Sequence, residues 1–158
     1  MGENFKYSLV VMLIIGTIIT LSPVLASDVS MLDALDITPF SEDTVVTIDG
    51  IDFNIPRGYG EISAKDNEIN KVKGVDFITF QRDYMNDDAD TISISVFYDS
   101  AKSTNDITPH EGEVKKTIDG VDGVLLKEDN FDSFSYCLNG KTIMISAKNE
   151  TQIDDIMM

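Results

Sequence analysis

The chain has 158 residues, and its 28 acidic against 12 basic side chains give a formal net charge of −16. A surface of this sign repels phosphate backbones and anionic lipid headgroups, which argues against nucleic-acid binding. One Cys and one His exclude an intramolecular disulfide and zinc sites built from several such ligands. The acids are spread along the chain, which favours a role in solubility over a concentrated site for cations.

Residues 1–26 have the pattern of an export signal. Leu9–Leu21 is an apolar run of about thirteen residues, within the length of a signal-peptide core and short of the roughly twenty residues that span a bilayer. Pro23 follows the run, and the small residues before Ser27 form a cleavage site. The alternative is an uncleaved membrane anchor over residues 7–25, with the domain outside the cell.

The mature chain begins with a polar, acidic stretch over residues 27–43. Its composition predicts an acidic flexible tether with one brief helical turn near Met31–Leu35. Residues 44–158 suffice for one domain and are too few for two. We therefore expect a single exported domain, either extracellular or held at the cell envelope.

From Thr44 onward the pattern is that of β-hairpins. Asp49-Gly50, Asp119-Gly120 and Asn139-Gly140 are two-residue turns of the kind that needs positive φ at both positions and joins antiparallel strands. Residues 75–84 and 91–98 predict a further strand pair around a polar turn.

Three other segments interrupt this pattern. Residues 61–74 are polar and weakly periodic, which predicts a surface loop or a poor short helix. Residues 99–112 predict a long polar connection. Asp122-Gly123, shortly after the second Asp-Gly turn, permits a bulge or a longer loop.

A short helix is expected to close the chain. Asn149 is a good N-cap with Gln152 three residues later, and Ile153, Ile156 and Met157 form one apolar side. The fold class is therefore α+β: a mainly antiparallel sheet built from hairpins, with this helix packed on one face. The helix is too short to cover that face alone. Further cover is expected from residues 61–74, from residues 100–110 or from a partner subunit. The covered face is expected to consist of Phe53, Ile55, Ile92, Ile94, Val96, Val124, Leu126, Phe134, Tyr136, Ile143 and Ile145.

Two sites can be read from local motifs. Asn86, Asp88 and Asp90 have the alternating spacing of the first ligands of a calcium loop, although Thr91 and Phe97 stand where that loop has Gly and Glu. An ordinary solvated hairpin turn is the competing interpretation.

The other motif is a glycosylation sequon, Asn149-Glu150-Thr151, which matters because the domain is expected to be exported. Its Asn is also the expected helix cap, and one side chain does not easily serve both roles.

Catalytic chemistry finds little support in the sequence. Cys137 lies in a predicted strand, where an isolated Cys usually acts as a small apolar residue, and His110 lies in a polar loop with no motif that links the two. A Ser-His-Asp triad lacks a motif around the single His. We therefore expect no catalytic residue, no cofactor and no enzymatic activity.

The order of motifs resembles a group of known sequences. TIDG-x-x-F-x-IP-x-GY from Thr47, KTIDGVDG from Lys116 and FSYCLNGKTIMIS from Phe134 resemble small uncharacterised exported proteins of methanogenic archaea, over residues 44–157. The resemblance implies a sheet-plus-helix domain and no particular activity. At the level of fold alone, the chain is also similar to PsbP/Mog1-type accessory domains.

Two functions of different class follow as expectations. The first is a non-catalytic exported or cell-envelope domain that binds a partner protein or a surface polymer. The alternative is a small carboxylate-dependent hydrolase acting on envelope polysaccharide, because two suitably placed acids suffice for glycoside cleavage. Two carboxylates facing each other in a concave pocket would favour the alternative.

Overall fold

The structure is a computed structural model, and it describes residues 30–72 and 74–158. The predicted signal peptide, its cleavage point and the alternative membrane anchor lie outside these residues. None of the helices in the described ranges has the length and apolar character needed to cross a membrane.

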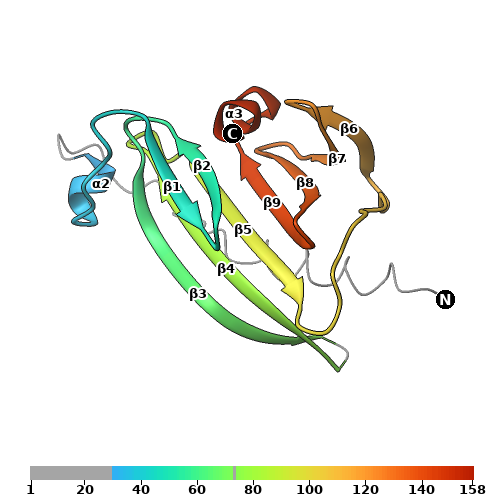
Figure 1. Cartoon of the computed structure of the whole chain (residues 1–158). Coiled ribbons are helices and arrows are strands. Elements are labelled where there is room, and N and C mark those ends of the chain that lie inside the picture. Colours follow the sequence, from blue (N-terminus) through green and yellow to red (C-terminus); the bar gives the residue numbers. More distant parts are fainter. Residues whose placement is uncertain (1–29, 73) are drawn as a thin grey trace.

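Seven antiparallel strands form the main sheet, in the order β3-β4-β5-β9-β8-β7-β6 (Figure 1). Their bounds are β3 Gly60–Val72, β4 Val75–Met85, β5 Thr91–Asp99, β6 Glu113–Ile118, β7 Val121–Lys127, β8 Asp132–Leu138 and β9 Lys141–Ala147. The sheet consists of two meanders, β3 to β5 and β6 to β9, which are joined where β5 pairs with β9. Together with the C-terminal helix described below, this confirms the predicted α+β class.

All three predicted two-residue turns are confirmed. Each joins two paired strands in the expected register, and both residues of each turn have positive φ. The φ values are 48° and 80° for Asp49-Gly50, 47° and 75° for Asp119-Gly120, and 53° and 79° for Asn139-Gly140. Gly is the residue that adopts this region at no steric cost, and Asn and Asp tolerate it better than most.

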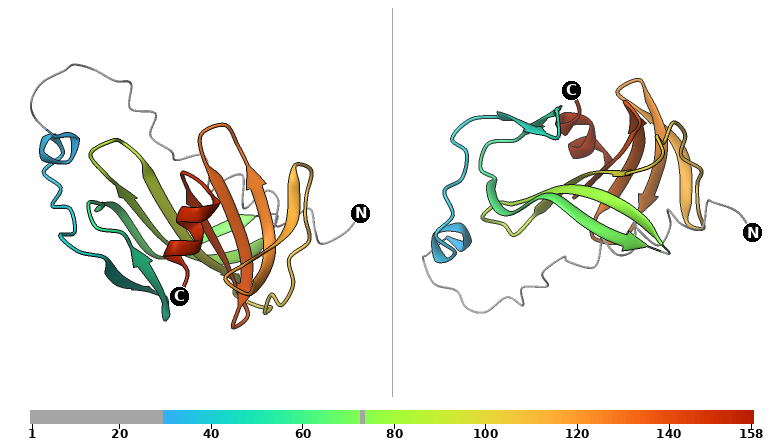
Figure 2. Two further views of the ribbon diagram at one scale, coloured as in Figure 1. Left: turned by 90° about the horizontal axis from the view of Figure 1, so that it is seen from above. Right: turned by 60° about the horizontal axis from the view of Figure 1, so that its bottom comes forward.

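One face of the main sheet, here called the inner face, is covered by two separate elements. These are the helix α3 (Glu150–Ile156) and a hairpin of β1 (Thr44–Ile48) with β2 (Ile51–Ile55), which forms its own two-stranded sheet. Figure 2 shows both elements on the same side of the main sheet. The second cover is thus the β1–β2 hairpin rather than residues 61–74, residues 100–110 or a partner subunit.

The buried core lies between this cover and the inner face. Phe53 and Ile55, which we expected within the main sheet, belong to the covering hairpin instead and pack against the sheet from the opposite side. The core residues are Ile48, Ile51, Phe53, Ile55, Tyr59, Tyr84, Ile92, Ile94, Val96, Ile118, Leu125, Phe134, Tyr136, Ile143, Ile145, Ala147, Ile153, Ile156 and Met157.

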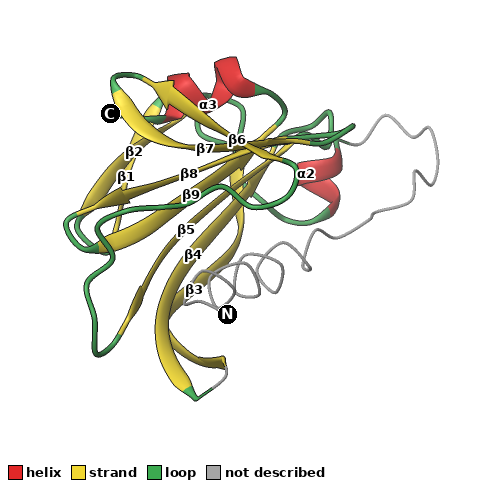
Figure 3. Ribbon diagram, turned by 90° about the vertical axis from the view of Figure 1, so that its right-hand side faces the viewer, coloured by secondary structure: helices red, strands yellow, loops and turns green. Residues whose placement is uncertain are grey.

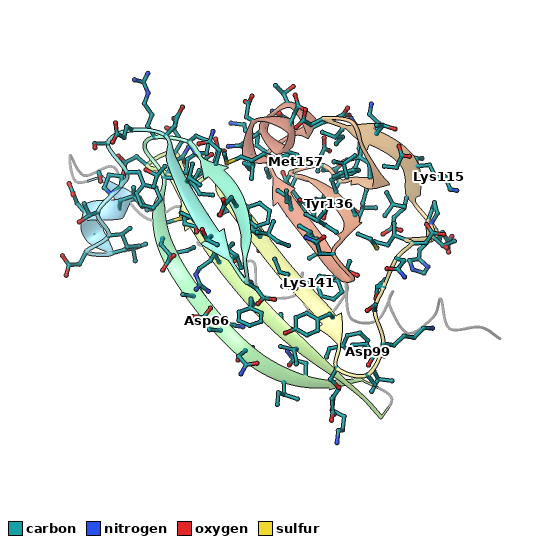
Figure 4. The ribbon with its side chains drawn as sticks, viewed as in Figure 1. Asp66, Asp99, Lys115, Tyr136, Lys141 and Met157 are labelled. Atoms are coloured by element: carbon teal, nitrogen blue, oxygen red, sulfur yellow. The ribbon has the colours of Figure 1, made fainter. Side chains whose placement is uncertain are left out.

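Specific polar contacts hold the hairpin in place. Lys141, at the start of β9, donates to the carbonyl oxygen of Asp49 at 2.7 Å and pairs with its carboxylate at 2.8 Å (Figure 4). The other end is bound to α3, because Asn54 donates its Nδ2 to the carbonyl of Asp155 at 3.2 Å. The turn and the second strand of the hairpin are therefore fixed to different parts of the fold.

The closing helix forms as predicted. Asn149 caps it by accepting a hydrogen bond from the backbone N–H of Gln152 at 3.0 Å. Ile153 and Ile156 are fully buried and Met157 is nearly so, which confirms the predicted apolar side. Figure 3 shows α3 lying across the upper ends of the sheet strands.

Residues 61–72, expected as part of a loop or a poor short helix, belong instead to β3. The strand lies at the edge of the sheet and carries mostly polar side chains, so it lacks the apolar alternation from which a strand is recognised. Its register shifts twice, between Glu61 and Ser63 and between Lys65 and Glu68. Arg82 of β4 holds the strand through an ion pair with Asp66 at 2.6 Å.

The assignment of side chains to faces was wrong in β7. Leu125 is opposite Phe134 and shares its face, so Leu125 belongs to the core, whereas Val124 and Leu126 point to the other, outer face. No bulge or longer loop forms at Asp122-Gly123, because pairing with β6 continues without a shift from Val121 onward.

Residues 30–43, predicted as part of the tether, contact the domain. The helical turn α2 (Met31–Ala34) is confirmed, and Leu32 within it is fully buried. Phe40 and Gly58 are joined by a hydrogen bond between the N–H of Gly58 and the carbonyl of Phe40 at 2.8 Å. This stretch therefore lies along the chain that leaves β2.

Gly123 has a packing role that allows a test. A Cβ at this position would lie 2.6 Å from Cζ of Phe134 and would also collide with the carbonyl oxygen of Ser135. We expect Gly123→Ala to lower the free energy of unfolding by about 1–3 kcal/mol, the usual effect of overpacking. Chemical denaturation measures it. In a double-mutant cycle, Phe134→Leu should reduce the effect of Gly123→Ala, and strict additivity would contradict the proposed collision.

Burial of α3 gives a second test. Ile153→Asp and Ile156→Asp each place a charge in the core and should lower stability by more than about 3 kcal/mol, so that the double variant unfolds or aggregates. Met158→Asp is the matched control, because Met158 is 71% exposed, and it should leave the denaturation midpoint unchanged. A folded double variant whose helix amides exchange freely would show that the sheet does not depend on α3.

Candidate functional site

The outer face of the main sheet, opposite α3, carries small polar side chains. Asp83, Ser93, Ser146 and Ser133 form one row across β4, β5, β9 and β8. Ser93 donates to the carboxylate of Asp83 at 2.6 Å, and Ser146 donates to the hydroxyl of Ser133 at 3.0 Å. A face of this kind differs from the apolar inner face and provides hydroxyl groups for polar contacts.

Residues 100–112 cross part of the outer face and enclose a small cavity. Thr104 donates its backbone N–H to the carbonyl of Gly140 at 3.0 Å, which binds the segment to the β8–β9 turn. The cavity has a volume of about 60 Å³, enough for a few water molecules and well below the roughly 300 Å³ of the smallest typical ligand pockets. Its lining residues are Phe97, Thr104, Asp106, Ile107, Thr108, His110, Glu113, Val124, Ser135 and Thr142.

A larger open groove lies next to the cavity, with Asp106 and Ile107 lining both. It has a volume of about 640 Å³, which is within the range of ligand-binding clefts. Apart from Asn105, its other residues come from strands β6, β7 and β8, so the groove runs along one margin of the sheet. Its lining residues are Asn105, Asp106, Ile107, Lys115, Lys116, Thr117, Asp122, Gly123 and Cys137.

Cys137 and His110 line different hollows. Burial raises the pKa of the Cys137 thiol, a hydrogen bond with Thr142 opposes this, and the charge of Asp106 adds to the increase. His110 instead lines the cavity, where its backbone N–H donates to the carboxylate of Glu113 at 2.8 Å. The structure thus gives Cys137 the environment of a protonated thiol rather than of an activated nucleophile.

Strand β6 forms one wall of the groove and has a free edge. The two-residue turn after β6 is closed by the pair Ile118 and Val121, and the pair that closes such a turn is hydrogen-bonded. Along an antiparallel ladder, hydrogen-bonded and non-hydrogen-bonded pairs alternate. The backbone N–H and C=O groups of Lys115 and Thr117 therefore point away from β7. No other described strand pairs with this edge.

The two edges of the sheet differ in their protection. The β3 edge has two register shifts, and such irregularities hinder pairing with a further strand. The β6 edge is regular over its whole length, and residues 114–117 are exposed. Lys115 is directed away from the sheet (Figure 4) and has no ion pair among the described residues, while Lys116 is 2.7 Å from Glu150.

The calcium candidate forms a compact turn. Oδ1 of Asn86 accepts hydrogen bonds from the backbone N–H groups of Asp88 at 3.1 Å and Asp90 at 2.9 Å. Asp90 also pairs with Lys148 at 2.8 Å, and this bond raises the pKa of the lysine. In the ranges that the structure describes, no group of three or more His, Cys, Asp or Glu is arranged to hold a metal ion. Calcium binding at this turn stays an untested prediction.

The glycosylation candidate, Asn149, is exposed at the N-terminal end of α3.

Sequence reasoning did not identify the groove or the open edge of β6. The residues Val114–Thr117 indicate a strand, but nothing in them shows that this strand is outermost.

Comparison with protein-family models, curated proteins and solved structures finds no match to this chain.

The environment of Cys137 predicts its reactivity. Because its pKa is raised, less thiolate is present near neutral pH, so the folded protein should react with iodoacetamide several-fold more slowly than free cysteine. The rate should rise to that of free cysteine in denaturant. Mass spectrometry of the alkylated protein over time gives both rates, and a folded protein that reacts faster than free cysteine would contradict the assignment.

Proposed function

We propose that this is a non-catalytic exported or cell-envelope domain that binds a partner through the groove on its outer face and the adjoining edge of β6. The observation that carries the proposal is the combination of a groove of about 640 Å³ with a regular, unpaired strand edge in its wall. An extended polypeptide can add a strand to such an edge through main-chain hydrogen bonds and place alternate side chains in the groove. This favours a partner protein over a surface polymer.

Charge restricts which strands can pair there. Two β6 edges placed side by side would bring Lys115 and Lys116 of one copy close to those of the other, and like charges across strands are destabilising. Lys116 is paired with Glu150, but Lys115 is not paired among the described residues. The edge is therefore suited to a different partner with a carboxylate opposite Lys115, and it is protected against pairing with itself.

The alternative, a carboxylate-dependent hydrolase acting on envelope polysaccharide, has one observation in its favour. Asp106 and Glu113 both line the cavity under residues 100–112. Against it, the cavity of about 60 Å³ is too small for a sugar unit, and Glu113 already accepts a hydrogen bond from the backbone of His110. Partner binding is therefore the better supported proposal.

Binding at the edge can be tested with proline. Thr117→Pro removes an outward N–H and leaves the hydrogen bonds between β6 and β7 intact, which is where proline is tolerated in a sheet. Envelope proteins and envelope polysaccharide, purified separately from the producing cells, serve as probes. We expect the wild-type domain to bind one or more envelope proteins and Thr117→Pro to weaken this binding at least about tenfold, since it removes a main-chain contact and its pairing geometry.

Two controls separate this effect from simple damage. Thr117→Val loses the same hydroxyl, which bonds to Asp122 at 2.6 Å, but keeps the N–H. Ile69→Pro introduces proline at the opposite edge. Both should bind as the wild type does. Equal binding by Thr117→Pro and Thr117→Val would show that the edge is not used, and binding to polysaccharide alone would assign the groove to a surface polymer.

A further inference from the structure

Asn149 offers one atom of its side chain to the helix and leaves the other free. Its Oδ1 caps α3 by accepting the hydrogen bond from the N–H of Gln152 at 3.0 Å. Its Nδ2 donates no hydrogen bond to any described residue. N-linked sugars are attached to Nδ2, and the modified amide keeps its carbonyl oxygen. Capping and glycosylation therefore use different atoms and are compatible, contrary to the expectation from sequence.

The sequon is also accessible. Asn149, the N-cap of α3, and Thr151 are both exposed, whereas Ile153 and Ile156 are buried in the core. Glu150, between the two sequon positions, is held by Lys116 at 2.7 Å and by Lys127 at 3.2 Å. These ion pairs lower the pKa of Glu150 and fix the first turn of the helix without covering the amide.

A hollow adjoins the free amide. It has a volume of about 510 Å³, which is comparable to known small-molecule sites of roughly 300–1,000 Å³. Asn149 and Thr151 line it from the helix, and Thr117 and Asp119 line it from the end of β6 and its turn. The hydroxyl of Thr151 and the carboxylate of Asp119 are groups that form hydrogen bonds with the hydroxyl groups of a sugar.

We propose that Asn149 carries an N-linked glycan and that the first sugar of this glycan lies in the hollow between α3 and the β6–β7 turn. The inference rests on the proposed export, since the sugar donor is met on the export route. The donor is an oligosaccharide linked to a polyprenyl phosphate carrier. Its C1–O bond breaks as C1 bonds to Nδ2, the phosphate leaves with the bonding electrons, and Nδ2 loses one proton.

Three variants separate the sequon from the cap. Asn149→Ser keeps a capping oxygen and removes the amide that accepts the sugar. Thr151→Ala keeps Asn149 and breaks the sequon, whereas Thr151→Ser preserves it. Each protein is recovered from the producing cells, and the peptide that contains residue 149 is weighed by mass spectrometry. The wild type and Thr151→Ser should carry the mass of a glycan on this peptide, and the other two variants should not.

Unglycosylated protein made in a bacterial cytoplasm provides the folding control. There the wild type, Asn149→Ser and Thr151→Ala should unfold at nearly the same denaturant concentration, because all three keep a helix cap. Loss of the glycan in the variants then cannot result from misfolding.

Two further outcomes distinguish the parts of the inference. An exported wild-type protein with an unmodified Asn149 overturns the glycan and leaves the proposed function standing. A protein that is not exported at all overturns the export on which both proposals rest. Where the glycan is present, amide exchange at Asp119, which lines the hollow, should be slower than in Thr151→Ala. Equal exchange would show that the sugar points away from the hollow.

Discussion

The fold depends on covering the inner face of a seven-stranded sheet with elements that are each too small for the task. The helix α3 has two turns and the β1–β2 hairpin has two five-residue strands. Neither is stable in isolation, since short helices and single hairpins are marginal in water. They are stable because each buries apolar side chains against the sheet and because Asn54 and Asp155 join them to each other.

Polar contacts decide where these covers sit. Hydrophobic burial has little directional preference, so it does not by itself place a hairpin at one position on a broad apolar face. Lys141 holds the Asp49 turn at one end of the hairpin. Gln152 donates to the hydroxyl of Tyr59 at 2.7 Å, where the chain leaves the hairpin. Such bonds contribute modestly to stability, but they fix the relative positions of the two covers.

The turns and the helix packed on one face of the sheet were predictable from the sequence, whereas the covering hairpin and the β3 edge were not. The Asp-Gly and Asn-Gly turns and the Asn149 cap follow from backbone preferences of a few residues. The β3 edge was missed because an exposed edge strand needs little apolar surface and therefore has no alternation to detect. Phe53 and Ile55 alternate with polar residues, as apolar residues do in any half-buried strand. This pattern does not show in which sheet the strand lies. The groove could not be predicted from the sequence either, because it depends on β6 being the outermost strand.

The pairing of β5 with β9 has a consequence for how the domain is made. Each meander consists of neighbours in sequence and can form early, but β5 and β9 are separated by two-fifths of the described chain, with Ser93 opposite Ser146. Non-local pairing of this kind slows folding, since the intervening loop must be closed first. During synthesis the β3–β5 meander emerges while the edge of β5 has no partner, and α3 packs on β8 and β9 only after both strands have emerged. The domain therefore stays incompletely folded until β9 and α3 have been synthesised, and it is exposed to aggregation until then.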